Sequence, residues 1–153
     1  MKIREAMTKN VVKVAPSTGI RNIYDLFCEK QIGCVPVVNG DNKIVGMVTK
    51  TEILDVLIPD YFGMVSDFLF IDDFGALEKK LESLPVLELF LAEDLMERDV
   101  ITINENASLV KAPVLMNKHN LRRLPVIDKD GTLVGIISKM DVCRALFKDR
   151  GTE

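Results

Sequence analysis

Two seven-residue stretches carry residue types that suit a phosphorylated, hydroxyl-bearing small molecule. They read Gly46-Met47-Val48-Thr49-Lys50-Thr51-Glu52 and Gly135-Ile136-Ile137-Ser138-Lys139-Met140-Asp141. In the second, glycine permits close backbone approach at the end of a strand, and the Ser138 hydroxyl with the free N–H groups of a starting helix can bind phosphate. Asp141 follows one turn later and can accept from two ribose hydroxyls. The same residues also fit a structural part, in which Ser138 caps the helix and Asp141 complements its dipole.

The two stretches belong to an internal duplication, because the chain matches itself without a gap when it is shifted by 89 residues. Proline, glycine and the apolar blocks keep one register between residues 7–54 and 96–143. Chance rarely preserves such a register, so we expect two copies of one supersecondary unit. Matched blocks include Met7 on Met96, Val35–Val38 on Leu124–Ile127, and Ile44–Thr49 on Leu133–Ser138.

Each copy has the pattern β-α-β-β-α, which predicts an α+β fold with two pseudo-symmetric repeats packed as one globule. We divide the chain into repeat one at 1–57, an insert at 58–94 and repeat two at 95–150. Pro113 lies inside a helix expected to start near Asn106 or Ser108, where it should kink the helix or delay its start. In repeat one we expect a strand at Val11–Val14, followed by a helix capped by Ser17 or Thr18. The apolar stripe of this helix is Ile20, Ile23, Tyr24 and Phe27. We then expect a strand covered on both faces at Val35–Val38, a turn at Asn39–Asn42, a strand at Ile44–Thr49, and a helix that begins between Thr49 and Glu52.

Composition excludes several classes of protein. Hydrophobic residues make up 48% and charged residues 28% of the 153 residues, which fits an ordinary folded core. No apolar run approaches the roughly 18 residues of a membrane span, and residues 1–7 lack the apolar region of a secretory signal. Three cysteines favour reduced thiols and a cytoplasmic location over a disulfide framework. The single histidine argues against a His-based metal site or catalytic relay.

The insert is acidic and aromatic. Residues 55–94 hold ten acidic and two basic residues, and six of the nine aromatic side chains of the chain. This charge argues against a nucleic-acid partner. Two readings stay open for the insert: it covers its own domain, or it makes a dimer contact or docks a partner protein. Residues 77–91 have helical spacing broken by Pro85, which predicts two short helices.

Taken together, the duplicated residues resemble a tandem pair of CBS domains, the motif named after cystathionine β-synthase. The resemblance covers about 100 residues and rests on both heptads, which the family writes Gly-h-x-Thr/Ser-x-x-Asp with h apolar, each ten residues after the proline of an apolar strand. It implies a non-catalytic regulatory CBS pair, or Bateman module. The resemblance also implies a homodimer formed through the helices expected at 20–27, 51–57, 109–116 and 140–147.

In this family the ligand lies in the cleft between the repeats. The stretch around Arg123 is similar to one in the γ subunit of AMP-activated protein kinase that supplies a phosphate-binding arginine. The similarity implies the same role for Arg123, whose planar guanidinium suits bidentate contact with phosphate. The resemblance therefore implies a ligand site made of Ser138, Asp141, Arg123, Ile136, Val12, Ile32, Gly33 and Cys34.

A second, pseudo-symmetric cleft departs from the family pattern. Glu52 replaces the aspartate, and Cys34 stands where repeat two has Arg123. This cleft lacks a cationic side chain to bind phosphate and the aspartate that usually accepts from the ribose, so we expect it to be empty or to bind weakly. Its residues are Thr49, Glu52, Met47, Ile101, Leu121 and Arg122.

The sequence thus predicts a binding module that senses an adenine nucleotide and acts on an unidentified partner or on its own dimer. AMP, ADP or ATP is favoured over S-adenosylmethionine, which has no phosphate for Ser138 and Arg123. We expect no required cofactor and no membrane contact. The alternative is a ligand-free interaction module that works through the insert at 58–94. An enzyme is disfavoured because there is no Ser–His–Asp set, CxxC pattern or Gly-rich phosphate loop.

Overall fold

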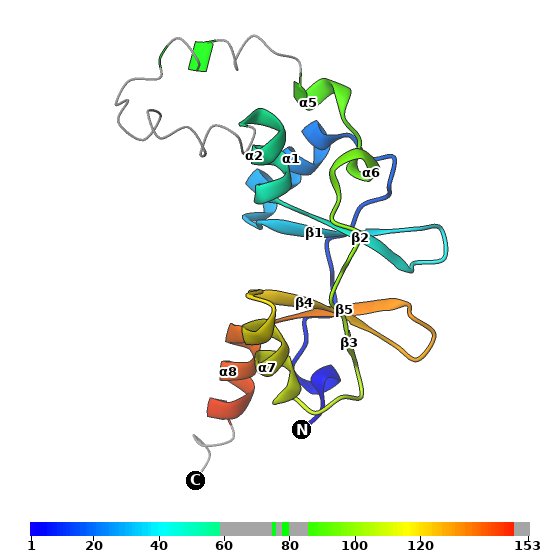
Figure 1. Cartoon of the computed structure of the whole chain (residues 1–153). Coiled ribbons are helices and arrows are strands. Elements are labelled where there is room, and N and C mark those ends of the chain that lie inside the picture. Colours follow the sequence, from blue (N-terminus) through cyan, green and yellow to red (C-terminus); the bar gives the residue numbers. More distant parts are fainter. Residues whose placement is uncertain (59–74, 76–77, 80–85, 149–153) are drawn as a thin grey trace. The chain divides into compact units, whose positions relative to one another are not determined.

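The computed structural model describes residues 1–58, 75, 78–79 and 86–148. The chain divides into two compact units. Unit 1 comprises Met1–Lys13, Val38–Val45 and Asp99–Glu153, and unit 2 comprises Val14–Val37 and Gly46–Arg98. Each unit mixes helices and strands, so the α+β class predicted from the sequence is confirmed (Figure 1).

Unit 1 is built on a three-stranded sheet of order β3-β4-β5, with β3 at Ile103–Asn104, β4 at Arg123–Ile127 and β5 at Leu133–Ser138. Strand β3 runs parallel to β4, and β4 runs antiparallel to β5. Helices α7 (Lys111–Lys118) and α8 (Lys139–Lys148) cover one face of this sheet (Figure 1). The core between them holds buried aliphatic side chains: Ile3, Ile103, Leu109, Met116, Leu124, Val126, Ile137 and Val142.

Unit 2 repeats the arrangement with a two-stranded sheet. Strands β1 (Cys34–Val38) and β2 (Ile44–Thr49) form this sheet, which helix α1 (Ile20–Lys30) precedes and helix α2 (Lys50–Leu57) follows in the chain. The tip of the hairpin, Val38–Val45, is assigned to unit 1. The short helix α5 (Val86–Leu89) packs on α1, and α6 (Ala92–Leu95) packs on α2. Residues 35–38 are all buried, as expected for a strand covered on both faces.

Three local predictions for repeat one need correction. The strand expected at Val11–Val14 is reduced to one parallel bridge between Val14 and Val37. Helix α1 is capped by Gly19 rather than by Ser17 or Thr18, because the Thr18 hydroxyl instead accepts from the N–H of Ala15 at 3.1 Å. Three members of the predicted apolar stripe are buried, but Tyr24 is 43% exposed.

Pro113 delays the start of its helix, which is one of the two outcomes predicted. Helix α7 begins at Lys111 and has 8 residues, whereas α1 begins at Ile20 and has 11. Pro113 is the third residue of α7, in the first turn, where a backbone N–H has no partner within the helix. A missing N–H therefore costs nothing at this position.

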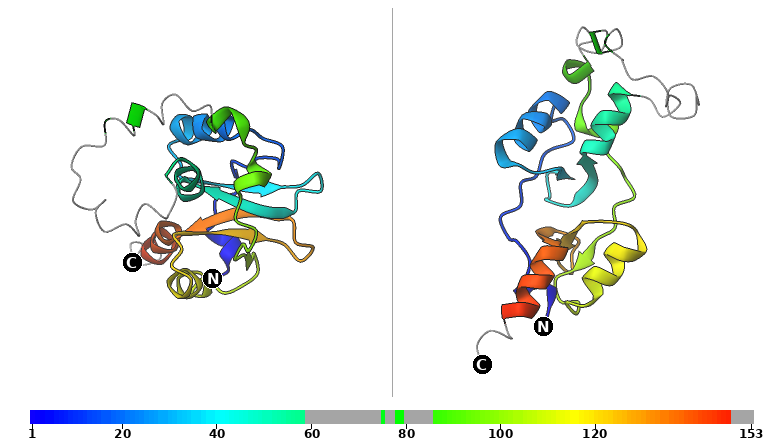
Figure 2. Two further views of the ribbon diagram at one scale, coloured as in Figure 1. Left: turned by 45° about the horizontal axis from the view of Figure 1, so that its top comes forward. Right: turned by 90° about the vertical axis from the view of Figure 1, so that its left-hand side faces the viewer.

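The first segment of each repeat packs in the unit built by the other repeat. Thr8 forms two backbone hydrogen bonds with Ile136, at 2.9 and 3.0 Å, within unit 1. Glu97 forms the equivalent pair with Met47, at 2.9 and 2.8 Å, within unit 2. The compact units therefore cut across the sequence division at 1–57, 58–94 and 95–150. In Figure 2 the blue N-terminal segment runs beside α8 of unit 1.

The heptad glycines make room for these segments. A Cβ atom at Gly46 would lie 2.4 Å from the Met96 sulfur, and one at Gly135 would lie 2.6 Å from the Met7 sulfur. The close approach predicted from these glycines is therefore made by a methionine side chain.

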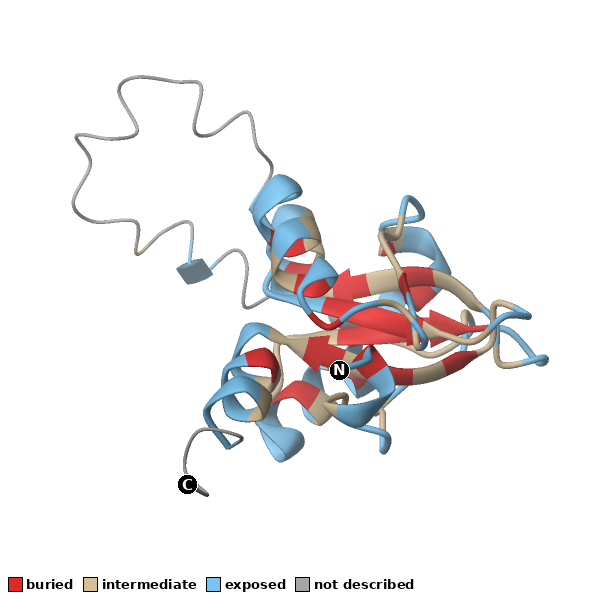
Figure 3. Cartoon of the chain, turned by 90° about the horizontal axis from the view of Figure 1, so that it is seen from below, coloured by how far each residue is buried: buried red, intermediate tan, exposed pale blue. Residues whose placement is uncertain are grey.

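Buried residues concentrate on the strands, and exposed residues lie on the outer sides of the helices (Figure 3). In the part of the chain that the structure describes, no helix is both long and apolar enough to span a membrane. Most of the insert, including the aromatic run at 67–74, lies outside the described residues. Within the predicted helical stretch at 77–91, Val86–Leu89 forms α5.

Candidate functional site

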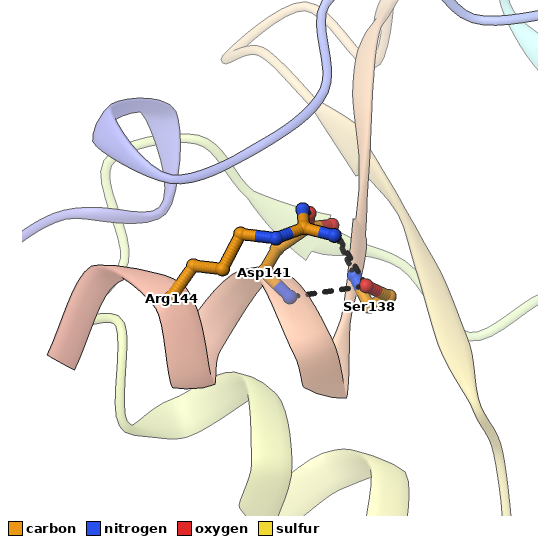
Figure 4. A network of polar contacts seen from close by, with 3 residues as sticks. All are labelled: Ser138, Asp141 and Arg144. Carbon is orange, nitrogen blue, oxygen red and sulfur yellow. Dashed lines mark hydrogen bonds and ion pairs between the residues drawn. The ribbon is translucent and has the colours of Figure 1, made fainter. Parts of the chain in front are cut away.

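Ser138 and Asp141 stand at the junction of β5 and α8. The carboxylate of Asp141 accepts from the backbone N–H of Ser138 at 2.8 Å and from its hydroxyl at 2.9 Å, both on Oδ2. The N–H of Asp141 in turn donates to the Ser138 hydroxyl oxygen at 3.1 Å (Figure 4). These reciprocal bonds form a capping box, so the two residues have the helix-capping role that is one of the two roles predicted for them.

Arg123 lies directly across the sheet from Ser138. The two residues are register partners in the antiparallel pair β4 and β5. Directly opposite residues in such a pair present their side chains on the same face, with Cβ atoms about 5 Å apart. Arg123 is exposed and has no hydrogen bond or ion pair with any residue that the structure describes. Unit 1 therefore brings a free guanidinium next to the predicted hydroxyl and carboxylate.

Two further predicted residues also belong to unit 1. Ile136 precedes Ser138 by two positions on β5, so its side chain lies on the same face and is half-buried. Its backbone is engaged by Thr8. Val12 is half-buried in the N-terminal segment, which has no regular secondary structure there.

A small polar cavity of about 250 Å³ opens beside Asp141 within unit 1. Arg144 lies on its wall and donates to the Oδ1 atom of Asp141 at 3.2 Å (Figure 4). The Arg144 side chain is 65% exposed, whereas that of Asp141 is 11% exposed. The cavity is lined by Glu5, Ala6, Thr8, Asp141, Arg144, Ala145 and Lys148.

Sequence reasoning missed Arg144, Lys148 and Thr8. The spacing of Arg144 from Asp141, three residues along one helix, was a usable signal because such residues face each other. Lys148 lies one more turn along the same face. For Thr8 the sequence held no such signal, since the duplication does not tell which repeat the N-terminal segment joins.

Ile32 and Gly33 connect α1 to β1 in unit 2, and Cys34 is the first residue of β1. The carbonyl of Gly33 accepts from the N–H of Lys50 at 3.1 Å, which ties this connection to the start of α2. Cys34 is a free thiol of intermediate exposure. The contact of these three residues with a ligand held by Ser138 stays a prediction.

The residues of the second predicted cleft divide in the same way. Met47, Thr49 and Glu52 belong to unit 2, while Ile101, Leu121 and Arg122 belong to unit 1. Glu52 accepts from the Thr49 N–H at 2.7 Å and from the Thr49 hydroxyl. The longer side chain thus reproduces the contacts that Asp141 makes with Ser138.

A separate cavity of about 470 Å³ lies between α1 and α2. Its lining is mainly apolar, including Phe27, Ile53, Leu54 and Leu57. At its edge, the Cys28 thiol raises the pKa of Tyr24 above its usual value, first through a side-chain hydrogen bond and then through charge repulsion. Among the residues described, no group of three or more His, Cys, Asp or Glu side chains is arranged to hold a metal ion.

Comparison with known proteins decides the family. The family model described as CBS domain matches residues 3–59 and again residues 92–148. The chain belongs to the CBS domain family. The second match begins at the start of α6, so this CBS repeat includes a segment equivalent to the short 3-10 helix η1 (Ile3–Glu5).

Two similar proteins match this chain almost end to end. The uncharacterized protein MJ1426 of Methanocaldococcus jannaschii is 28% identical over 96% of this chain and 92% of its own length. The CBS-pair protein CBSX2 from Arabidopsis thaliana is 26% identical, with a TM-score of 0.78 over 99% of this chain and 98% of that chain. A crystal structure of CBSX2 in complex with AMP superposes with a TM-score of 0.73, at 26% identity over 97% and 98% of the two chains.

Other curated relatives are longer, and this chain spans 40%, 64% and 48% of three of them. This chain therefore corresponds to only part of these three relatives.

Proposed function

We propose that the chain is a non-catalytic regulatory CBS pair that binds an adenine nucleotide through Ser138, Asp141 and Arg123 of unit 1. The observation that carries this proposal is the register pairing of Arg123 with Ser138, one turn from Asp141. The pairing brings three groups together on one edge of unit 1: a cationic side chain that can bind phosphate, a hydroxyl, and a carboxylate that can accept hydrogen bonds from a ribose. The CBSX2 complex with AMP, a protein of the same family and length, supports it.

The chemistry of each residue follows from its bonds. The carboxylate of Asp141 now accepts from Ser138 and Arg144, and these local bonds can be exchanged for the two hydroxyls of a ribose. Ser138 and the N–H groups at the start of α8 then face phosphate, with Arg123 offering a bidentate contact. S-Adenosylmethionine has no phosphate for these groups, which favours AMP, ADP or ATP.

The first experiment is a thermal-shift panel with AMP, ADP, ATP, S-adenosylmethionine and GTP. A ligand at 100 times its Kd adds about 2.7 kcal/mol to the free energy of unfolding, a shift of several degrees for a chain of this size. We expect a shift with one adenine nucleotide that disappears in Asp141→Ala. No shift with any of these ligands would refute the proposal.

Loss of a helix cap also lowers stability, so a matched control is needed. Glu52→Ala removes the equivalent cap from α2 in the first repeat. We expect it to lower the melting temperature about as much as Asp141→Ala, because each removes one capping side chain worth about 1 kcal/mol. Glu52→Ala should nevertheless keep the ligand-induced shift. Arg123→Ala should weaken AMP binding much more than adenosine binding.

We also propose that the chain is a homodimer that transmits the nucleotide signal to a partner protein. Exposed apolar side chains on the long helices of both units support this proposal, and sedimentation at several concentrations tests it. A chain that sediments as a monomer and responds to no nucleotide would favour the alternative, an interaction module acting through 58–94. These side chains are Tyr24, Leu54, Val114, Met140, Leu146 and Phe147.

A further inference from the structure

The cavity beside Asp141 differs in charge from the positions that the 89-residue shift relates to it. Its charged side chains are Glu5, Asp141, Arg144 and Lys148. The 89-residue shift places Asp94, Glu52, Asp55 and Pro59 at these four positions, and Glu97 at the position of Thr8. The five cavity positions of unit 1 thus present two acids and two bases, whereas the five positions related by the shift present four acids and no base.

The described residues of the two sets are equivalent in the folded units as well as in the sequence, and Pro59 lies outside the described part of the chain. Thr8 pairs with Ile136 as Glu97 pairs with Met47. The carboxylate of Asp94 accepts from the N–H of Leu91 at 2.9 Å, which is the bond that Glu5 makes with Lys2 in unit 1. Helix α6, which carries Asp94, packs on α2, which carries Asp55. Carboxylates at these positions disfavour a phosphorylated ligand in unit 2, because like charges repel.

We infer that Arg144, assisted by Lys148, is a specificity-determining residue that limits the module to one phosphorylated ligand per chain, bound at unit 1. This inference rests on the proposed function, because it concerns the ligand held at Asp141. Arg144 adds a second cationic group to that of Arg123. It lies one turn after Asp141 on α8, whereas Ser138 lies one turn before.

Ligand hydroxyls can replace Arg144 at the carboxylate of Asp141, because the ion pair between these two residues is weak. A pair between residues three apart on a helix, with the arginine 65% exposed, is weak and opens readily. When ligand hydroxyls take the Oδ1 atom of Asp141, the guanidinium is released beside the cavity and can bind an anionic oxygen in its planar fork. Lys148 lines the same cavity and has no partner among the described residues, so it supplies further positive charge.

Titration calorimetry with AMP and with adenosine tests the inference on the unaltered chain, Arg144→Asp and Arg144→Lys. The first variant installs the charge found at the equivalent position of repeat one. We expect one AMP per chain in the unaltered protein. Arg144→Asp should weaken AMP binding by about tenfold or more, the scale of a lost hydrogen bond to a charged group. Adenosine binding should change by less than about threefold, and Arg144→Lys should retain most of the AMP affinity.

Asp55→Arg is the matched control, because it makes the reciprocal exchange in unit 2 and should leave the AMP affinity of unit 1 unchanged. Equal losses of AMP and adenosine affinity in Arg144→Asp would overturn the inference, since Arg144 would then only order Asp141. Two equivalent AMP molecules per chain would also overturn it. Both outcomes leave the proposed function intact, whereas an unaltered chain that binds neither compound refutes the proposed function itself.

Discussion

At the scale of single residues, the heptads combine two tasks in the same atoms. Ser138 and Asp141 close the N-terminus of α8 through reciprocal hydrogen bonds, and Thr49 and Glu52 do the same for α2. A hydroxyl and a carboxylate that satisfy backbone N–H groups in the absence of ligand are already held in place when a ligand arrives. The structural and functional readings of the heptad are therefore compatible.

The heptad glycines give a prediction about stability. In Gly46→Ala and Gly135→Ala the new methyl group would overlap Met96 and Met7, so we expect each substitution to lower the free energy of unfolding by about 1–3 kcal/mol. Gly40→Ala is the control, because a Cβ atom added there would meet nothing within 4 Å. Urea unfolding measures the three variants. Equal stability of Gly46→Ala and Gly40→Ala would contradict the packing of Met96 on the glycine.

The candidate site could be predicted only in part from single residues. Ser138, Asp141 and Arg123 follow from the heptad and the family resemblance, and unit 1 brings all three together. The cavity wall formed by Thr8 and Arg144 was not predicted. Arg144 was overlooked although its spacing was informative, whereas the place of Thr8 depends on a tertiary contact that no local pattern encodes.

At the scale of elements, apolar patterning and turn residues predicted the strands well. The bounds of β2 coincide with the predicted Ile44–Thr49, because turn residues mark the start of the strand and a helix cap marks its end. The predicted strand at Val11–Val14 failed because β propensity alone does not supply a pairing partner. Only Val14 finds one, in Val37.

Helix α7 yields a prediction that separates proline tolerated in a first turn from proline in a helix interior. We expect Pro113→Ala to change the free energy of unfolding by less than about 1 kcal/mol, since no hydrogen bond is regained. Val114→Pro, at a side chain that is 59% exposed, should cost about 3 kcal/mol because it removes a backbone bond and crowds the preceding turn. Thermal unfolding followed by circular dichroism compares them. Similar losses in the two variants would show that α7 starts later than Lys111.

At the scale of the whole molecule, the duplication predicts the fold but not which segments share a unit. The shift of 89 residues relates Met7 to Met96 and Gly46 to Gly135. This relation is the same whether each methionine packs on the glycine of its own repeat or on that of the other. The sequence symmetry therefore leaves both arrangements open, and the structure selects the exchanged one.

The exchange makes the N-terminus part of a core, which gives the last prediction. Ile3 is fully buried in unit 1, and its N–H donates to the carbonyl of Ala107 at 3.0 Å. We expect Ile3→Ala to cost about 2–5 kcal/mol, as in other aliphatic cores. The exposed Lys9→Ala should cost less than about 0.5 kcal/mol.

Hydrogen exchange locates the effect of Ile3→Ala. Amides of β4, β5 and α8 should lose protection first, because Ile3 contributes to the core beneath them, although they lie 120 or more positions away in the sequence. If amides of α1 and β1 lost protection first instead, the N-terminal segment would belong to its own repeat and the exchanged arrangement would be wrong. The cavity beside Asp141 would then lose Glu5 and Thr8 from its wall. A single core substitution thus tests how the site at Ser138 and Asp141 is assembled.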